Sequence, residues 1–180
     1  MKTYAEYYED AYGSTQIDYE QIKRFIDSCP EGDIVEIGAG SGRLVPLYTE
    51  GRNYLFVEPS SDMLQILNKK ILNKRNLKVI DSFAEKLPLS SESVAGVIFA
   101  FASLGEMRPI LFALYECVRV LKPGGKIYIL QNNPETFQTA AVGLNRAIKN
   151  KSEASVSAET IRAPEKGPYS FDVHFRNSAT

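Results

Sequence analysis

The sequence predicts an α/β domain built on a doubly wound, mostly parallel sheet. Short apolar segments alternate with helical patterns between Asp33 and Leu130, and a glycine-rich turn directly follows the first apolar segment. The apolar segments lack polar alternation, as strands do when helices cover both faces of a parallel sheet. The predicted strands are residues 34–37, 54–57, 77–80, 94–99 and 126–130.

Two helices are expected before the first strand. Tyr4, Tyr8 and Tyr12 follow one another at intervals of four and share one helical face. That face either covers a bound ligand or packs on the sheet. A second helix is predicted over 18–28, where apolar residues have helical spacing, and it ends before Pro30.

Between the strands, apolar spacing predicts helices at 44–48, 63–72 and 110–121. After Leu130, residues 135–149 have helical composition, and residues 151–167 predict a mobile loop. Residues 169–175 alternate apolar and polar, which predicts one last strand, antiparallel and at or near a sheet edge. The carboxyl-terminal part is therefore expected to be short, with one strand.

Composition favours one domain over the full 180 residues, because 44% of them are hydrophobic and 24% are charged. We expect a helical lid at 1–30, a ligand-binding core at 31–131, and a helix, loop and final strand at 132–180. A formal charge of −1 and no basic stripe argue against a nucleic-acid partner. The sequence has no run of about 18 apolar residues, so membrane insertion is not expected. It begins without a leader pattern, so we expect a cytoplasmic protein.

Cys29 and Cys117 are far apart and have no metal-ligating neighbours in the sequence. We therefore expect two reduced thiols and no metal.

The glycine turn after the first strand points to a ligand site. Gly38, Gly40 and Gly42 stand where open α/β sheets bind ligands, and glycine has no Cβ to block the approach of a ligand to the backbone. The spacing is G-x-G-x-G, whereas a dinucleotide fingerprint is G-x-G-x-x-G, and Arg43 stands where its third glycine would be. No P-loop lysine follows the turn. A tight turn with no ligand is the structural alternative.

Two acidic residues add to this site. Glu58 ends the second strand about twenty residues after the turn, where a carboxylate accepts hydrogen bonds from both ribose hydroxyls. The alternative for Glu58 is a solvated strand end. Glu36 stands inside the apolar first strand, and a buried carboxylate needs donors or a cation, such as a ligand ammonium reached directly or through water.

Four stretches, residues 35–44, 57–64, 84–89 and 116–125, resemble in order the motifs of class I S-adenosylmethionine-dependent methyltransferases. The likeness covers roughly Ile17 to Leu130. It is closest to the type 11-like branch, with its ubiquinone and menaquinone C-methyltransferases and many small-molecule enzymes. The resemblance implies a Rossmann-like fold, S-adenosylmethionine as cofactor and S-adenosylhomocysteine as product.

The resemblance also implies roles for single residues. Gly38 and Gly40 lie against the methionine part of the cofactor, Glu36 anchors the turn and the ammonium environment, and Glu58 binds the ribose. Met63 packs on the adenine. The full set of implied cofactor residues is Glu36, Gly38, Ala39, Gly40, Gly42, Arg43, Glu58, Pro59, Met63, Phe83, Ala84, Glu85 and Phe99.

One position departs from the family. Phe83 stands where the family often has an aspartate that reaches the adenine amine. Phe83 either stacks on the ring or fills space, while the Ala84 backbone N–H remains available to the adenine.

Methyl transfer is an in-line displacement, so the protein mainly positions the acceptor and excludes water. Phe101, Ser103 and Glu106 follow the fourth strand and are the acceptor-side candidates. Glu106 is a candidate base, or else a carboxylate favoured at a helix start. His174, the single histidine, is the other candidate base, or else a structural residue.

The sequence thus predicts methyl transfer to an unidentified small-molecule acceptor. The alternatives are a cofactor-binding accessory subunit without activity and, with less support, an NAD-dependent oxidoreductase. Because one terminal strand is expected to be missing, we expect a homodimer or a partner subunit to complete the carboxyl-terminal region.

Overall fold

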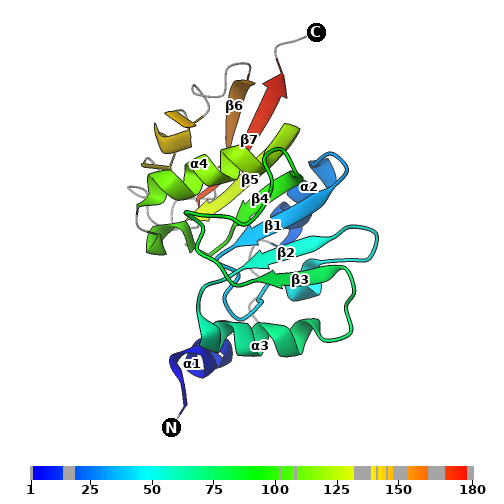
Figure 1. Ribbon diagram of the computed structural model, residues 1–180, viewed down its shortest axis with the longest axis vertical. Coiled ribbons are helices and arrows are strands. Elements are labelled where there is room, and N and C mark those ends of the chain that lie inside the picture. The colour runs from blue at the N-terminus through cyan, green and yellow to red at the C-terminus, as the bar shows by residue number, and fades with distance from the viewer. Residues whose placement is uncertain are drawn as a thin grey trace.

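A seven-stranded sheet in the order β3-β2-β1-β4-β5-β7-β6 forms the centre of the computed structural model (Figure 1). The structure describes residues 2–13, 19–101, 103–107, 109–131, 139–140, 142–144, 146–147, 154–161 and 169–177. The sheet confirms the predicted α/β, Rossmann-like, mostly parallel fold.

The first five strands are parallel, and they are the five strands that the sequence predicts. They are β1 (Asp33–Ile37), β2 (Tyr54–Val57), β3 (Leu77–Ile80), β4 (Val94–Phe99) and β5 (Leu121–Gln131). β5 begins five residues before the predicted start at Lys126 and contains a register shift against β4. Gly124, with φ +76°, lies in that irregular part.

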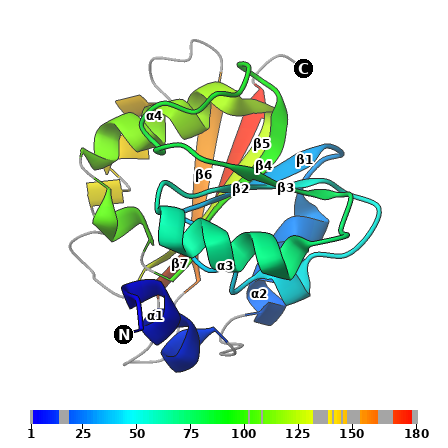
Figure 2. The same cartoon turned by 60° about the horizontal axis from the view of Figure 1, so that its bottom comes forward.

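Helices cover both faces of the sheet (Figure 2). These helices are α2 (Tyr19–Ser28), α3 (Ser61–Ile71) and α4 (Ile110–Val120), and a further helix, α1 (Tyr4–Tyr12), lies against α3. One core lies between the sheet and α4 and contains Val35 and Ile37. The other core contains Ile34 and lies under α2 and α3. Side chains along a strand alternate between faces, so Glu36 of β1 belongs to the α2 and α3 face.

The helix expected at 44–48 is reduced to one 3-10 turn, η1 (Val45–Leu47). Pro46 stands in the first turn, where a missing backbone N–H is tolerated. The turn ends because Tyr48 takes an extended conformation, with ψ 116°. A second 3-10 turn, η2 (Ser103–Glu106), follows β4. Described residues between 139 and 147 are helical, in agreement with the composition of that segment.

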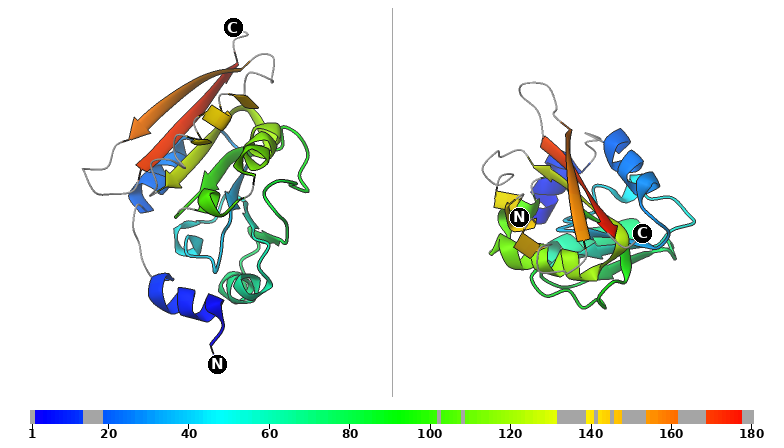
Figure 3. Two further views of the ribbon diagram at one scale, coloured as in Figure 1. Left: turned by 90° about the vertical axis from the view of Figure 1, so that its left-hand side faces the viewer. Right: turned by 90° about the horizontal axis from the view of Figure 1, so that it is seen from above.

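The carboxyl-terminal part contributes two strands. β6 (Ala154–Ile161) and β7 (Tyr169–Asn177) pair with each other, and β7 also pairs with β5, always antiparallel (Figure 3). The loop expected over 151–167 is therefore wrong for Ala154–Ile161. β7 confirms the predicted last strand, and the additional strand β6 forms the edge of the sheet. β6 and β7 of this chain therefore occupy the place for which a strand of a partner subunit was expected.

None of the helices in the described part of the chain is long and apolar enough to cross a membrane.

Candidate cofactor site

A cavity of about 590 Å³ opens at the carboxyl ends of β1, β2 and β4. Most of the cofactor residues that the sequence implies lie on its wall. They are Glu36, Gly38, Ala39, Gly40, Arg43, Glu58, Pro59, Met63, Phe83, Ala84 and Glu85.

Two residues of the implied set lie elsewhere. A Cβ on Gly42 would stand 2.5 Å from Leu67 Cδ1 of α3, so Gly42 permits close packing of α3 on the turn. Phe99 is fully buried in the core under α4. Both residues pack in the interior, and their implied contact with the cofactor stays a prediction.

The other two glycines of the turn also have positive φ, +67° at Gly38 and +55° at Gly40. A Cβ on Gly38 would come within 2.7 Å of Ser103 Cβ, so Gly38 lets the segment after β4 approach the turn. A Cβ on Gly40 would meet nothing within 4 Å. Gly40 therefore presents bare backbone to the cavity, and glycine adopts this conformation without steric strain.

Glu58 holds the glycine turn from β2. One carboxylate oxygen accepts a hydrogen bond from the Gly40 N–H at 2.8 Å, and the other accepts from the Ser60 N–H at 2.9 Å. The residue is 7% exposed. Each carboxylate oxygen has two lone pairs, so both oxygens keep the capacity to accept from a ligand hydroxyl.

Glu36 is the most deeply buried carboxyl group of the site, at 4% exposure, and it accepts a hydrogen bond from the Tyr48 hydroxyl at 2.9 Å. Burial raises its pKa to about 8, the bond from Tyr48 acts in the opposite direction, and the neighbouring Glu58 charge raises it further. A ligand cation beside Glu36 would favour ionisation. Tyr48 was not predicted, although a buried carboxyl group signals that some donor must be present.

The turn after β3 forms the side of the cavity near Met63. Phe83 lines the cavity but is 67% exposed, whereas Ala84 is buried. The Ser82 hydroxyl donates to the carbonyl oxygens of Phe83 and Lys86 at 3.2 and 3.0 Å and fixes the bend. An exposed aromatic ring at the mouth is suited to stacking on a flat ligand.

The opposite side of the cavity carries Phe101, Ser103, Glu106 and Met107 from the segment after β4. The Ser103 hydroxyl is buried and has no hydrogen-bond partner among the described residues. Phe101 has φ +51°, a conformation that non-glycine residues rarely adopt. The structure thus brings all three acceptor-side candidates to one wall.

Helix α1 lies against α3, away from the sheet (Figures 1 and 3). Tyr4 and Tyr8 line the cavity, and Tyr12 is exposed. The tyrosine face therefore lies on the cavity and not on the sheet, and its covering of a bound ligand stays a prediction.

The His174 backbone pairs with Lys126, five residues before the carboxyl end of β5. Its strand position is thus far along β7 from the edge where the cavity opens, and its role as a base stays a prediction. In the described ranges, no group of three or more His, Cys, Asp or Glu residues is arranged to hold a metal ion.

Comparisons with known proteins agree on one family. The model of the family described as "Methyltransferase domain" matches residues 35–129, more than half of the chain. The rat (Rattus norvegicus) thiol S-methyltransferase TMT1B is 25% identical over 134 residues, which cover 73% of this chain and 55% of the relative. The ubiquinone/menaquinone biosynthesis C-methyltransferase UbiE of Wigglesworthia glossinidia brevipalpis is 30% identical over 118 residues, covering 61% and 46%.

The chain thus spans about half the length of these curated relatives. Among solved structures, an S-adenosylmethionine-dependent methyltransferase from Aquifex aeolicus superposes with a TM-score of 0.71 at 20% identity and covers 97% of this chain and 98% of that one. That likeness shows the same fold from end to end. The chain belongs to the methyltransferase domain family of class I S-adenosylmethionine-dependent methyltransferases, and S-adenosylmethionine is its cofactor.

Proposed function

We propose that this chain transfers the methyl group of S-adenosylmethionine to a small-molecule acceptor. The observation that carries the proposal is the pair formed by Gly40 and Glu58. Gly40 exposes bare backbone to the cavity, and Glu58 fixes that backbone while retaining acceptor capacity for a ribose.

The residues present fit the cofactor. The cavity of about 590 Å³ is in the range of small-molecule and cofactor sites. Glu58 can accept hydrogen bonds from the ribose hydroxyls, and Met63 and Phe83 can pack on the flat adenine ring. Glu36 can pair with the cationic ammonium group. When bound, S-adenosylmethionine supplies a methyl group activated by its sulfonium.

The chain's own side chains orient the acceptor and exclude water. Tyr4 and Tyr8 of α1 line the same cavity as the segment after β4. Helix α1 therefore shields from solvent the part of the cavity where the methyl group is transferred. Glu106 is the acceptor-side residue that we assign to accept a proton where the acceptor must lose one.

The remaining expectations form part of this proposal. We propose one domain, with residues 1–30 as a helical lid, residues 31–131 as the cofactor-binding core, and residues 132–180 completing the sheet. The proposed protein is cytoplasmic and acts without a nucleic-acid partner.

A methyl-transfer assay tests the activity. The chain is incubated with S-adenosylmethionine carrying a labelled methyl group and with a panel of an aliphatic thiol, a phenol, a quinol and a primary amine. The names of the two relatives indicate sulfur and carbon acceptors, so the thiol and the quinol are the first choices. We expect label to enter one acceptor class and the Glu106→Gln variant to transfer it more slowly.

Binding of S-adenosylhomocysteine without transfer to any acceptor would instead favour the accessory subunit. The structure removes the premise of that alternative, because both terminal strands are present. Family membership likewise leaves the NAD-dependent oxidoreductase without support.

A further inference from the structure

Arg43 lies where the glycine turn, α1 and the segment after β4 meet. It directly follows Gly42 and is 7% exposed. Its guanidinium carbon stands 3.5 Å from the centroid of the Phe101 ring. Its hydrogen bond and its positive charge both act on the Tyr8 hydroxyl and partly offset the rise in the Tyr8 pKa that burial causes. One side chain therefore contacts two separate walls of the cavity.

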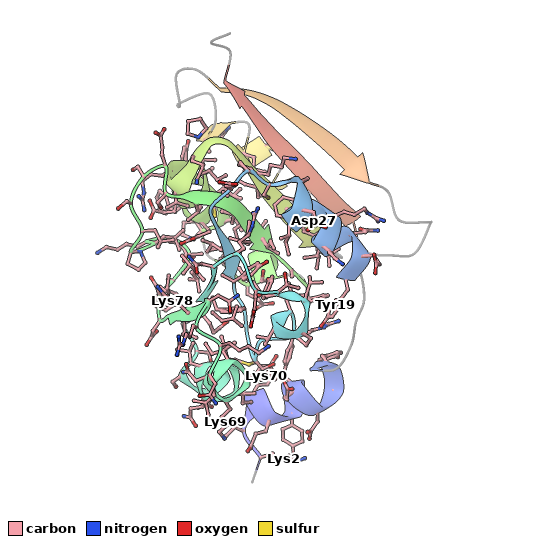
Figure 4. All side chains as sticks on the ribbon, turned by 90° about the vertical axis from the view of Figure 1, so that its right-hand side faces the viewer. Lys2, Tyr19, Asp27, Lys69, Lys70 and Lys78 are labelled. Atoms are coloured by element: carbon pink, nitrogen blue, oxygen red, sulfur yellow. The ribbon has the colours of Figure 1, made fainter. Side chains whose placement is uncertain are left out.

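The backbone of Arg43 is fixed independently. The Tyr19 hydroxyl of α2 donates a hydrogen bond to the Arg43 carbonyl oxygen (Tyr19 is labelled in Figure 4). The guanidinium thus extends from an anchored backbone toward α1 and Phe101, whose contacts with it depend on the side chain alone.

Phe101 needs such a contact. Its φ of +51° is disfavoured for a bulky residue. Backbone strain of this kind persists only where the surroundings hold it. The guanidinium over the face of the ring is an attractive cation–π contact that holds Phe101 in this conformation.

Helix α1 also depends on few contacts. Ala5 is its one buried residue, and Tyr4 is 76% exposed. An ion pair of 2.7 Å between Glu9 and Lys70 of α3 provides a second attachment, and both side chains are partly exposed (Lys70 is labelled in Figure 4). Elements with little apolar burial open locally at low free energy, and the contact between Tyr8 and Arg43 is a third attachment of α1.

We propose that Arg43 is a positioning residue that holds α1 and Phe101 together as the acceptor-side wall of the cavity. This differs from the role that the family resemblance implies, which is direct contact with the cofactor. The consequence for acceptor binding rests on the proposed function. The structural consequence, that α1 is held closed by Arg43, does not.

Hydrogen–deuterium exchange on the ligand-free chain tests this consequence. The variants are Arg43→Met, which removes both contacts, and Tyr8→Phe, which removes only the hydroxyl. We expect the amides of Tyr8 to Tyr12 to exchange roughly threefold to tenfold faster in both variants, since each loses a bond that closes α1. Exchange in α3 and in β1 to β4 should stay unchanged. Arg75→Met, which removes an exposed arginine, is the matched control and should behave as wild type.

A double variant, and a variant that removes the ion pair between Glu9 and Lys70, make the test more specific. Arg43→Met combined with Tyr8→Phe should exchange no faster in α1 than Arg43→Met alone, because both changes remove the same contact. Lys70→Met should add to either one, because it removes a different attachment.

Exchange of α1 in Arg43→Met equal to that of Arg75→Met, together with weaker S-adenosylhomocysteine binding, would overturn the proposal and make Arg43 a cofactor ligand. If Arg43→Met does not fold, Tyr8→Phe and Phe101→Leu decide. Faster α1 exchange in both supports the proposal, and wild-type exchange in both overturns it. None of these readouts uses an acceptor, so a failure of the proposed methyl transfer is distinguishable.

Discussion

Glu36 is a buried carboxyl group whose burial has a free-energy cost that depends on pH. Its pKa lies at about 8 in the folded chain, against an ordinary value of 4.5. Between these values the folded state binds more protons at this residue than the unfolded state does. Stability from this group is therefore present at low pH and is lost as the pH rises toward 8.

The Glu36→Gln variant tests that sign. Glutamine retains an oxygen that accepts from Tyr48 but does not titrate. From pH 5 to pH 9, the wild-type free energy of unfolding should fall relative to that of Glu36→Gln by on the order of 3 kcal/mol. Urea unfolding of both proteins at several pH values measures it. Parallel pH dependences of the two proteins would contradict the assigned environment of Glu36.

Gly40 and Gly124 form a matched pair of glycines. Both have positive φ, +55° and +76°, and a Cβ on either would meet nothing within 4 Å. Gly40 lines the cavity, whereas Gly124 lies in β5. Both alanine variants should lose about 1 kcal/mol of stability from backbone strain.

Only Gly40→Ala should weaken S-adenosylhomocysteine binding, by roughly tenfold or more, about 1.4 kcal/mol. Calorimetric titration of the two variants measures the difference. Equal affinities would mean that the cofactor does not approach Gly40.

Glu58 has two roles, holding the glycine turn and accepting hydrogen bonds from the ribose, and the Glu58→Gln variant tests the second role. Glu58→Gln keeps a single carbonyl oxygen for the N–H groups of Gly40 and Ser60. Loss of a charged acceptor should weaken S-adenosylhomocysteine binding by roughly 1.5–3 kcal/mol. Glu50→Gln, at an exposed position, should leave the dissociation constant unchanged. An unaltered constant in Glu58→Gln would remove Glu58 from the ribose role.

At the scale of elements, α4 holds the turn after β3 in place. Arg119 of α4 donates to the carbonyl oxygens of Leu87 and Leu89 at 3.0 and 2.7 Å, and Glu116 accepts from the Leu87 N–H at 2.7 Å. Arg119 also pairs with Glu116 at 2.6 Å and holds the pKa of that carboxyl below its usual range. Two motifs far apart in the sequence are therefore joined by direct bonds.

Breaking this junction should loosen the turn that carries Phe83 and Ala84. Arg119→Met leaves the Leu87 and Leu89 carbonyl groups without this donor and should cost about 1–3 kcal/mol of unfolding free energy. Denaturant unfolding of Arg119→Met against Arg75→Met provides the measurement. An unchanged midpoint in Arg119→Met would show that the turn is held by its other contacts.

At the scale of the whole molecule, the parallel half was predictable because its strands are continuous apolar runs. β6 was not predicted: Ala154, Val156 and Ala158 do alternate with polar residues, but two of these three side chains are small, and the strand pairs only with β7. Such an edge strand forms through non-local pairing, which the local pattern does not encode. Residues 44–48 were predicted as a helix on apolar spacing alone, and the extended conformation of Tyr48 limits them to one turn.

In the site, too, the sequence predicted some features and not others. The motifs predicted which loops form the cavity, because the carboxyl ends of parallel strands meet at one edge. They did not show which residues of these loops line the cavity, and Gly42 and Phe99 of the implied set pack in the interior. The contact of Arg43 with Tyr8 joins residues from different elements and has no local signal in the sequence.

The central claim is that the cavity at the ends of β1 and β2 binds S-adenosylmethionine. Calorimetric titration of the chain with the product S-adenosylhomocysteine, with NAD as the control, tests it most directly. The account predicts one-to-one micromolar binding of S-adenosylhomocysteine and no heat with NAD. Absence of S-adenosylhomocysteine binding, or binding of NAD in its place, would contradict it.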